Sequence, residues 1–290
     1  MWVIEALQDT FCKNHPLILV VGAGSSLGQA ISMDLATRGF IVLALHWEME
    51  TQNVLSRRWE RRKDEAKRPD ILGDIQHIYM DFNALGDMQS LTKRIEGIST
   101  TMYAMVYLGT PAGVRDTVQN LSEDELDDSR WVHMANLYRM AGIVQSFMPR
   151  GGFGRIVNVN YTSAWAIRPK NAVESVTSAA SRSLCRTLAT ELPSQGIAQT
   201  MVEMVSPSTQ VFGEKKSPYT ITTSKSSSHG TSQQDEQFSS YERDVVVPEI
   251  RRALYARWPR ITYYAGWEAK YQAFLYRVLG EAAMDTWYSL

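Results

Sequence analysis

The sequence predicts an α/β protein built on a doubly wound parallel sheet. Short apolar runs rich in β-branched residues recur along the chain, and most of them are separated by segments with helical spacing of apolar residues. A strand of a parallel sheet is a nearly continuous apolar run because helices cover both faces of the sheet. The alternation of strands and helices predicts right-handed crossovers, with the ligand crevice at the carboxyl ends of the strands.

The elements follow in order from the first apolar run. We expect the first strand at 17–21 (LILVV), followed by the glycine turn VVGAGSSLG and a helix that Gly39 ends. Segment 56–68, SRRWERRKDEAKR, mixes charges of both signs and is interpreted as a solvated helix face, with a cofactor-phosphate site as the lesser alternative. Further strands are predicted at 41–45, 75–80, 103–108, 154–159 and 200–205.

Composition argues against several classes of function. The 290 residues, 44% of them hydrophobic, suffice for one large domain spanning 1–290. A net charge of -1 creates no overall field that gathers nucleic acid, so we expect no nucleic-acid partner. Cys12 and Cys185 offer neither a disulfide framework nor metal-ligand spacing, so we expect no metal and a reducing, intracellular compartment, either cytoplasm or organelle matrix. The apolar start MWVIEAL is too short for a membrane span, so no transmembrane helix is expected.

The glycine turn is the first candidate binding site. Its candidate cofactor-binding residues are Gly22, Gly24, Ser25, Ser26 and Gly28. Glycines after a buried strand let the backbone approach a dinucleotide pyrophosphate, and the following helix offers free N–H groups and a positive dipole end. The alternative is a tight turn that binds no ligand.

The turn also carries a family resemblance. VVGAGSSLG resembles the TGxxxGxG turn of the short-chain dehydrogenase/reductase family, whose fold is a Rossmann-type doubly wound sheet. Gly22 and Gly28 match the outer glycines of that motif, whereas Val21 replaces its Thr and Ser26 replaces its middle Gly. We expect Ser26 to crowd a pyrophosphate in this turn.

Other cofactor positions match the family unevenly. The resemblance assigns the acidic residue that binds the adenine amino group to Asp81 in YMDF, with Phe82 beside it. The family's NNAG motif falls on 107–110, where both asparagines are missing, and Leu45 and His46 stand where an acid would hold the ribose. His46 is interpreted as a packing residue. The resemblance therefore implies NAD(P) as the cofactor, and the replacements predict that it binds weakly or not at all.

The catalytic positions of the family are also altered. Its members use a Tyr as general acid/base, a Lys four residues later that lowers the Tyr pKa, a Ser that orients the carbonyl and an Asn that supports a proton-relay water. WVHMANLYRMAG maps the Asn to Asn136, and GRIVNVNYTSA maps the Ser to Tyr161. SAASRSLCRTLATEL resembles the family's next helix and fixes the Tyr and Lys positions at Glu174 and Ser178. Of the four members, the resemblance retains Asn136 alone.

Substitute chemistry is conceivable at these positions. Glu174 could serve as a base, but a carboxyl with an ordinary pKa is ionised at neutral pH and lacks the cationic neighbour. Tyr161 is a phenol near the expected place, but the nearest lysine, Lys170, lies in a predicted loop. We therefore interpret these side chains as filling a former active site, with a rearranged redox site as the alternative.

Two segments near the C-terminus differ in composition from the rest. Residues 206–242 are rich in Ser, Thr, Gln and Lys, and we expect a flexible loop there. The last forty residues are rich in Tyr and Trp and resemble the C-terminal segment of the retinol and hydroxysteroid dehydrogenase branch, with GWEAK in place of GWDAK. Members of that branch usually carry an N-terminal membrane anchor, and none is expected here. The segment is interpreted as a packed helical cap, an apolar ligand pocket, or a contact with a second copy, a partner protein or a membrane surface.

These inferences lead to a hypothesis about function. We expect a degenerate short-chain dehydrogenase, a pseudoenzyme with a non-catalytic binding or complex-subunit role, that holds an apolar small molecule or contacts another protein. One alternative is an atypical NAD(P)-dependent oxidoreductase acting on a lipid, steroid or polyketide-like carbonyl. The other is a non-redox cyclase or isomerase that uses the apolar pocket and Glu174.

Overall fold

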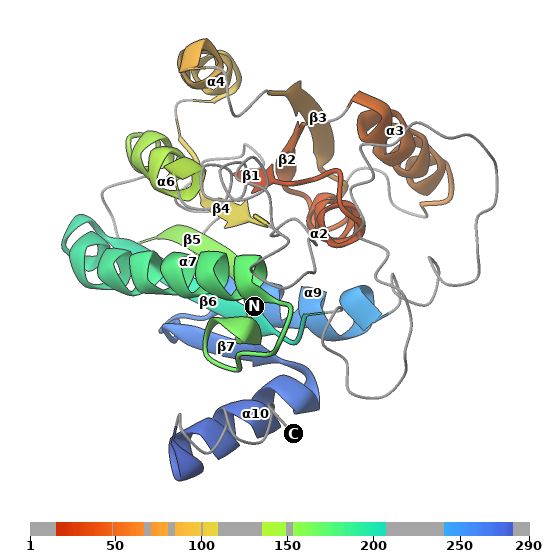
Figure 1. Ribbon diagram of the computed structural model, residues 1–290. Coiled ribbons are helices and arrows are strands. Elements are labelled where there is room, and N and C mark those ends of the chain that lie inside the picture. The colour runs from red at the N-terminus through yellow and green to blue at the C-terminus, as the bar shows by residue number, and fades with distance from the viewer. Residues whose placement is uncertain are drawn as a thin grey trace.

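All the strands of the described part of the chain lie parallel in one sheet (Figure 1). The computed structural model describes residues 16–47, 49–66, 71–80, 85–99, 101–109, 135–148, 153–206 and 241–280. The strand order is β3-β2-β1-β4-β5-β6-β7, so the order reverses between β1 and β4, where ligands bind in open α/β sheets. The strands are β1 (Leu17–Val21), β2 (Ile41–His46), β3 (Asp74–Tyr79), β4 (Ala104–Tyr107), β5 (Gly154–Tyr161), β6 (Ile197–Met204) and β7 (Thr262–Ala265). The predicted fold class is confirmed.

The central strand shows why the sheet is apolar on both faces. All five residues of β1 are buried. Ile18 and Val20 belong to one core cluster, whereas Leu17, Leu19 and Val21 belong to the other. Successive side chains of a strand point to opposite faces, so a strand covered on both sides must be apolar throughout.

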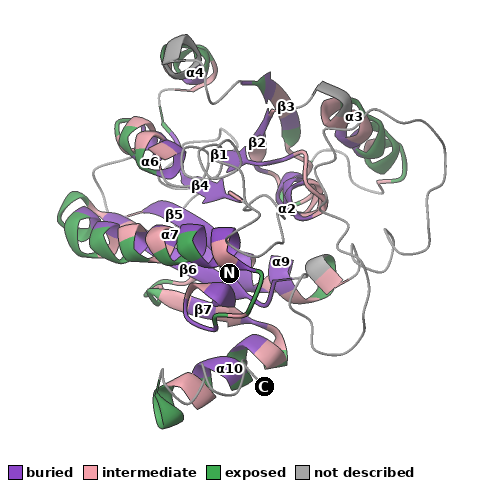
Figure 2. Cartoon of the chain, viewed as in Figure 1, coloured by how far each residue is buried: buried purple, intermediate pink, exposed green. Residues whose placement is uncertain are grey.

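Two layers of helices enclose the sheet (Figure 2). On one face, α2 (Ser26–Ala36), α3 (Met49–Asp64) and α9 (Val247–Tyr255) contribute side chains to the first core cluster. On the other face, α4 (Leu85–Ile98), α6 (Asn136–Gln145) and α7 (Ala172–Glu191) contribute to the second. The charged segment expected at 56–68 is helical as far as Asp64, and its helix begins earlier, at Met49.

The C-terminal part extends one edge of the sheet. No strand is expected from the sequence at 262–265. In the structure, β7 forms there and pairs with β6 in the register Met201↔Thr262. Helix α10 (Gly266–Leu279) follows directly and lies beyond β7 in Figure 1. A third, small cluster of Trp165, Ala166 and Ala273 joins this helix to the body, with Tyr276 packed against it.

Some expectations fall outside the described residues. These are the apolar start 1–15 with Cys12, the positions Asp81 and Phe82, most of the loop segment, 207–240, and the final aromatic residues Trp287 and Tyr288. None of the helices in the described ranges has the length and apolar character that crossing a membrane requires. The same ranges contain no group of three or more His, Cys, Asp and Glu side chains suited to a metal ion.

Candidate functional site

The glycine turn connects β1 to α2 at the carboxyl edge of the sheet. Gly22 has a φ of +86°, in the left-handed region that favours glycine. A Cβ at Gly28 would lie 2.2 Å from the carbonyl oxygen of Gly22, a distance that no side chain tolerates. Both glycines are therefore required by the turn itself, whether or not a ligand binds.

The polar groups of the turn are largely satisfied from within. The Ser25 hydroxyl accepts a hydrogen bond from the Gly28 backbone N–H at 3.0 Å and donates one to the Gly22 carbonyl at 2.9 Å. The Gln29 side chain donates to the Gly24 carbonyl at 3.0 Å. Ser25 thus acts as the N-cap of α2 and takes up one of the N–H groups that helix N-termini offer to phosphates.

Two side chains from the β2–α3 region pack directly against the glycines. A Cβ at Gly22 would lie 3.0 Å from Cη2 of Trp47. A Cβ at Gly24 would lie 2.6 Å from Oγ1 of Thr51. Trp47 and Thr51 therefore lie in contact with the turn, whose backbone a dinucleotide pyrophosphate would approach.

His46 ends β2 and is fully buried. Its Nδ1 lies 3.2 Å from Thr51 Oγ1, and its Nε2 lies 3.0 Å from Nδ1 of His77 on β3. His77 Nε2 in turn lies 2.9 Å from the hydroxyl oxygen of Ser56 on α3. Burial, with a smaller repulsion from His77, lowers the pKa of His46 to about 4, so the ring is neutral near pH 7. This series of hydrogen bonds joins β2, β3 and α3, a structural role that is typical of a packing residue.

The four positions assigned by the family resemblance lie on three neighbouring elements. Tyr161 is the last residue of β5, Asn136 is the first of α6, and Glu174 and Ser178 lie one turn apart on α7. All four side chains are buried.

Glu174 makes structural hydrogen bonds through both carboxylate oxygens. Asn171 Nδ2 donates to Oε1 at 2.9 Å, and the Ser206 hydroxyl donates to Oε2 at 2.7 Å. Glu174 lies in the first turn of α7, where the positive end of the helix dipole favours a negative charge. The carboxylate therefore ties the start of α7 to the end of the β6 segment.

Ser178 provides no cation at the expected lysine position. Its hydroxyl oxygen lies 3.5 Å from that of Ser163, and its carbonyl accepts a hydrogen bond from Asn160 Nδ2 at 3.0 Å. Lys170 is exposed and lies in the loop before α7.

Asn136 differs from the other three positions. Its side chain is 1% exposed, yet neither its amide nitrogen nor its amide oxygen has a hydrogen-bond partner within the described ranges. A buried amide without partners is costly, so this residue is not explained by packing alone.

Comparison with known proteins identifies the family. A family model described as short chain dehydrogenase matches residues 16–219. The chain belongs to the short-chain dehydrogenase family. Proteins of this family usually bind NAD(P), and solved oxidoreductase structures share the fold of this short-chain dehydrogenase. No curated protein gives a significant match.

Three solved structures illustrate the likeness. A short-chain dehydrogenase from Streptomyces avermitilis has a TM-score of 0.70 and 19% identity, covering 95% of this chain and 97% of that one. A bulky-bulky ketone specific alcohol dehydrogenase from Comamonas testosteroni has a TM-score of 0.64 and 17% identity, covering 91% and 93%. A sorbitol-6-phosphate 2-dehydrogenase from Erwinia amylovora has a TM-score of 0.55 and 20% identity, covering 65% and 70%. At these identities the structures share the fold alone.

Sequence reasoning listed Ser25 as a cofactor-binding residue but missed its role as the N-cap of α2, and it missed Trp47, Thr51 and Ser206. Ser25 carried a readable signal for this role, since Ser before an apolar helical run is a preferred N-cap. Trp47 and Thr51 carried none, because only the folded chain brings them against the glycine turn. The same holds for Ser206, which lies 32 positions from the carboxylate that it contacts.

Proposed function

We propose that this short-chain dehydrogenase family member is a pseudoenzyme with a non-catalytic binding or complex-subunit role. The hydrogen bonding of Glu174 carries the proposal. At the position where the resemblance expects the catalytic Tyr, a buried carboxylate accepts hydrogen bonds from Asn171 and Ser206. A group held through both oxygens stabilises a helix start and is poorly placed to exchange protons with a substrate.

Weak or absent NAD(P) binding belongs to the same proposal. Trp47 and Thr51 pack against the glycines, and Ser25 occupies an N–H at the start of α2. At Ser178, no ammonium is present to hold a nicotinamide ribose. These features support weaker binding of both the pyrophosphate and the nicotinamide ribose of NAD(P).

Exposed apolar side chains on α10, in the C-terminal segment, support the binding role. Trp267, Tyr271, Phe274 and Val278 of α10 are all exposed large side chains. Their spacing of four, three and four residues aligns them along one stripe of the helix. An exposed aromatic stripe is typical of a contact surface, which suits a second copy of the chain or a partner protein.

Calorimetric titration with NADH and NADPH tests the proposal. The unmodified protein is expected to show no dissociation constant below about 1 μM, the range of tight binding on the affinity scale. Trp47→Ala is expected to strengthen binding by uncovering Gly22, whereas Trp258→Ala, at an exposed site elsewhere, serves as the matched control. Submicromolar binding by the unmodified protein would refute the cofactor part. Mass spectrometry of the purified protein should reveal a retained apolar molecule or partner protein.

A residual enzyme is the second candidate, and Asn136 is the observation that favours it. Its buried amide has no hydrogen-bond partner within the described ranges, and the residue stands at the position that the resemblance assigns to the proton-relay Asn. One structural neighbour is described as specific for bulky ketones, which suggests an apolar ketone as the substrate to assay. Turnover by the unmodified protein that Glu174→Gln abolishes while binding persists would establish this candidate. Turnover without a nucleotide would assign a non-redox isomerase or cyclase.

A further inference from the structure

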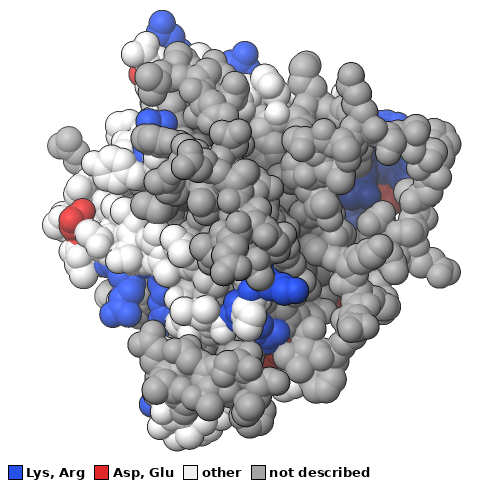
Figure 3. Space-filling view, in the orientation of Figure 1, with Lys and Arg blue, Asp and Glu red and all other residues white. Residues whose placement is uncertain are grey.

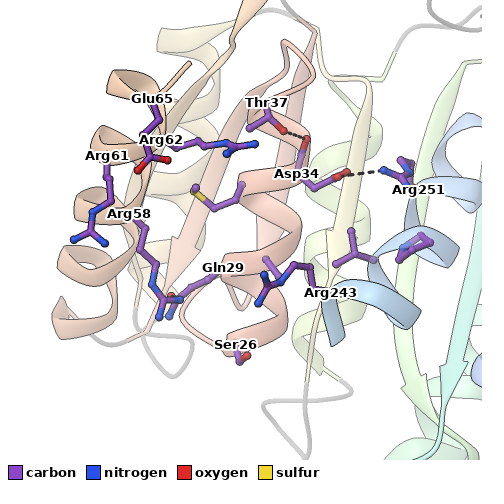
Figure 4. Close-up of a pocket in the computed structure, with 14 residues that line it drawn as sticks. Ser26, Gln29, Asp34, Thr37, Arg58, Arg61, Arg62, Glu65, Arg243 and Arg251 are labelled. Carbon is purple, nitrogen blue, oxygen red and sulfur yellow. Dashed lines mark hydrogen bonds and ion pairs between the residues drawn. The ribbon is translucent and has the colours of Figure 1, made fainter. Parts of the chain in front are cut away.

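A second concave site borders the glycine turn and lies away from the tetrad positions. It is a groove of about 780 Å³ between α2, α3, α9 and the π-helical turn Glu242–Val246 (η7). Figure 4 shows it opening between the outer faces of these helices. Ser26 lies at the end nearest the turn, and Thr37 lies at the other end of α2. Neither Gly22 nor Gly24 is among its lining residues, so the groove is a separate surface.

Arginine side chains dominate the lining of the groove. Arg58, Arg61 and Arg62 come from α3, Arg243 comes from η7 and Arg251 comes from α9. In Figure 4, Arg58 and Arg243 approach the Gln29 region from opposite sides. Arg62 reaches across toward α2, whereas Arg61 points away. Segments nearly two hundred residues apart thus bring their cations to one place.

The acidic residues of the groove do not balance these cations. Asp34 and Glu65 are the two acids among the lining residues, against five arginines. Asp34 is already shared between Arg251, at 3.2 Å, and Arg38 outside the groove, at 3.0 Å. Among the described lining residues, arginines therefore outnumber acids, in a chain whose formal net charge is -1.

The cations on α3 repel one another although the helix end favours two of them. Arg58, Arg61 and Arg62 are spaced by three and four residues, which puts like charges on one face, whereas the helix dipole favours Arg61 and Arg62 in the last turn. Figure 3 shows Lys and Arg side chains gathered at the right of the view, where α3 lies in Figure 1. An anionic ligand would relieve this repulsion.

The residue types favour phosphate over a diffuse counterion. Every cation in the lining is an arginine and none is a lysine. A guanidinium is planar and binds phosphate oxygens through two parallel hydrogen bonds, which a lysine ammonium does not reproduce. The floor contains Ala30, Met33, Val247 and Pro248, which offer apolar contact to the carbon part of a ligand.

We propose that this groove binds a small phosphorylated molecule carrying two or more phosphate groups. Arg58, Arg62 and Arg243 hold the phosphates from both walls, and Gln29, which accepts a hydrogen bond from Arg58 at 2.8 Å, orients that guanidinium. The site adjoins the glycine turn through Ser26 and Gln29, but the proposal does not depend on the non-catalytic role proposed above.

Calorimetric titration with inorganic pyrophosphate and with ADP tests the site on the full chain. Arg62→Gln and Arg243→Gln are expected to weaken binding by about tenfold to a hundredfold each, the loss of a charged hydrogen bond. Arg62→Lys should give an intermediate loss if two parallel hydrogen bonds matter. Arg57→Gln is the matched control, since Arg57 is exposed on the same helix but does not line the groove. Circular dichroism confirms that each variant is folded.

Three results would overturn the proposal. One is no binding of either probe by the unmodified protein at millimolar concentration. Another is an equal loss of affinity in Arg57→Gln, which would mean diffuse attraction to α3. The third is binding to phosphatidylserine vesicles that depends on Arg62 while pyrophosphate does not bind, which would assign the surface to a membrane. In a Trp47→Ala background, Arg62→Gln should weaken pyrophosphate binding by the same factor as in the unmodified protein, so this test stands apart from the cofactor test.

Discussion

Glu174 and Asn171 together stabilise the start of α7. Asn171 precedes α7 and Glu174 lies in its first turn, so the Asn171 amide and the helix dipole both stabilise the carboxylate. Ser206 adds a donor from the far end of β6. Removal of the carboxylate would leave two buried donors without an acceptor, which costs more than the bonds themselves contribute.

Glu174→Ala is therefore expected to lower the free energy of unfolding by about 1–3 kcal/mol, measured by urea denaturation. Glu174→Gln keeps an oxygen acceptor and should lose about 0.3–1 kcal/mol, the part due to charge near the helix start. Glu191→Gln is the control at the exposed opposite end of the helix, where a negative charge is not favoured. Unchanged stability of Glu174→Ala would contradict the structural role.

The His46 and His77 pair predicts a pH dependence of stability. Burial lowers the pKa of both rings, that of His46 to about 4 from 6.5, although Asp74 opposes the shift at His77. The unfolded chain then binds protons more readily than the folded chain between these values. Stability is fully present above about pH 6.5 and is lost as the pH falls toward 4, with a slope of up to about 1.4 kcal/mol per pH unit for one proton.

Urea denaturation between pH 4.5 and 7.5 measures this slope. His46→Gln should flatten it, and the double variant with His77→Gln should flatten it further. A slope that persists in the double variant would assign the effect to other groups.

At the scale of elements, α10 is attached to the body through a small aromatic contact. The rings of Trp165 and Tyr276 lie 5.0 Å apart, and Trp165 Nε1 donates to Glu203 Oε2 at 3.1 Å. Arg182 lies over the Trp165 ring and pairs with Glu203 at 3.3 Å. Burial raises the pKa of Glu203 although Arg182 opposes it, so the buried carboxylate depends on these partners.

Trp165→Ala should lower the free energy of unfolding by about 3–5 kcal/mol, the range for a large buried aromatic residue. Tyr276→Ala, at a half-buried site, should mainly speed amide hydrogen exchange in α10 and leave global stability less affected. Trp267→Ala removes an indole that is 67% exposed on the same helix and serves as the control. Equal exchange in all three variants would show that the aromatic contact does not hold α10.

The elements also show what the sequence can predict. The strand expected at 17–21 coincides with β1 because five β-branched-rich apolar residues before a glycine turn are too few for a helix. The strand at 200–205 begins three residues earlier in the structure, at Ile197, since Gln199 is a polar residue that the fold buries. β7 was missed because four residues in an aromatic segment form a strand only by pairing with β6, some sixty residues away.

The candidate site shows the same difference between local motifs, which the sequence reveals, and long-range contacts, which it does not. The mapped positions depend on local motifs, and the structure places Tyr161, Glu174 and Ser178 buried near one edge of the sheet. The contacts that assign their chemistry are not local. Trp47 over Gly22 and Arg243 opposite Arg58 arise only when distant segments pack together, so periodicity and motif spacing contain no signal for them.

At the scale of the molecule, we propose that an intact fold is combined with altered side chains and a covered glycine turn. These two losses can be separated by restoring the side chains with and without opening the turn. Tyr161→Ser, Glu174→Tyr and Ser178→Lys together should add little oxidation of NAD(P)H with an apolar ketone. Adding Trp47→Ala and Ser26→Gly should raise the rate, because a general acid/base contributes about 10²–10⁴-fold once cofactor can bind.

The control for this restoration carries Glu174→Phe in place of Glu174→Tyr, which supplies the ring without the hydroxyl. Stopped assays of NAD(P)H absorbance compare the variants at matched protein concentration. Equal rates in the Tyr and Phe versions would contradict a separate effect of the catalytic side chains. A rate in the unmodified protein as high as in the restored one would contradict it as well.

The hydrogen bonds of Glu174 also bear on the history of the chain. A reversal to Tyr would strip the acceptor from Asn171 and Ser206 at a cost of about 1–3 kcal/mol. A typical domain has a total stability of only about 5–15 kcal/mol, so this one step would consume a considerable part of it. No gain in activity would offset that loss while Ser178 and Trp47 remain. If the chain is a pseudoenzyme as proposed, selection for a folded protein would oppose each single reversal and keep the chain from returning to dehydrogenase chemistry.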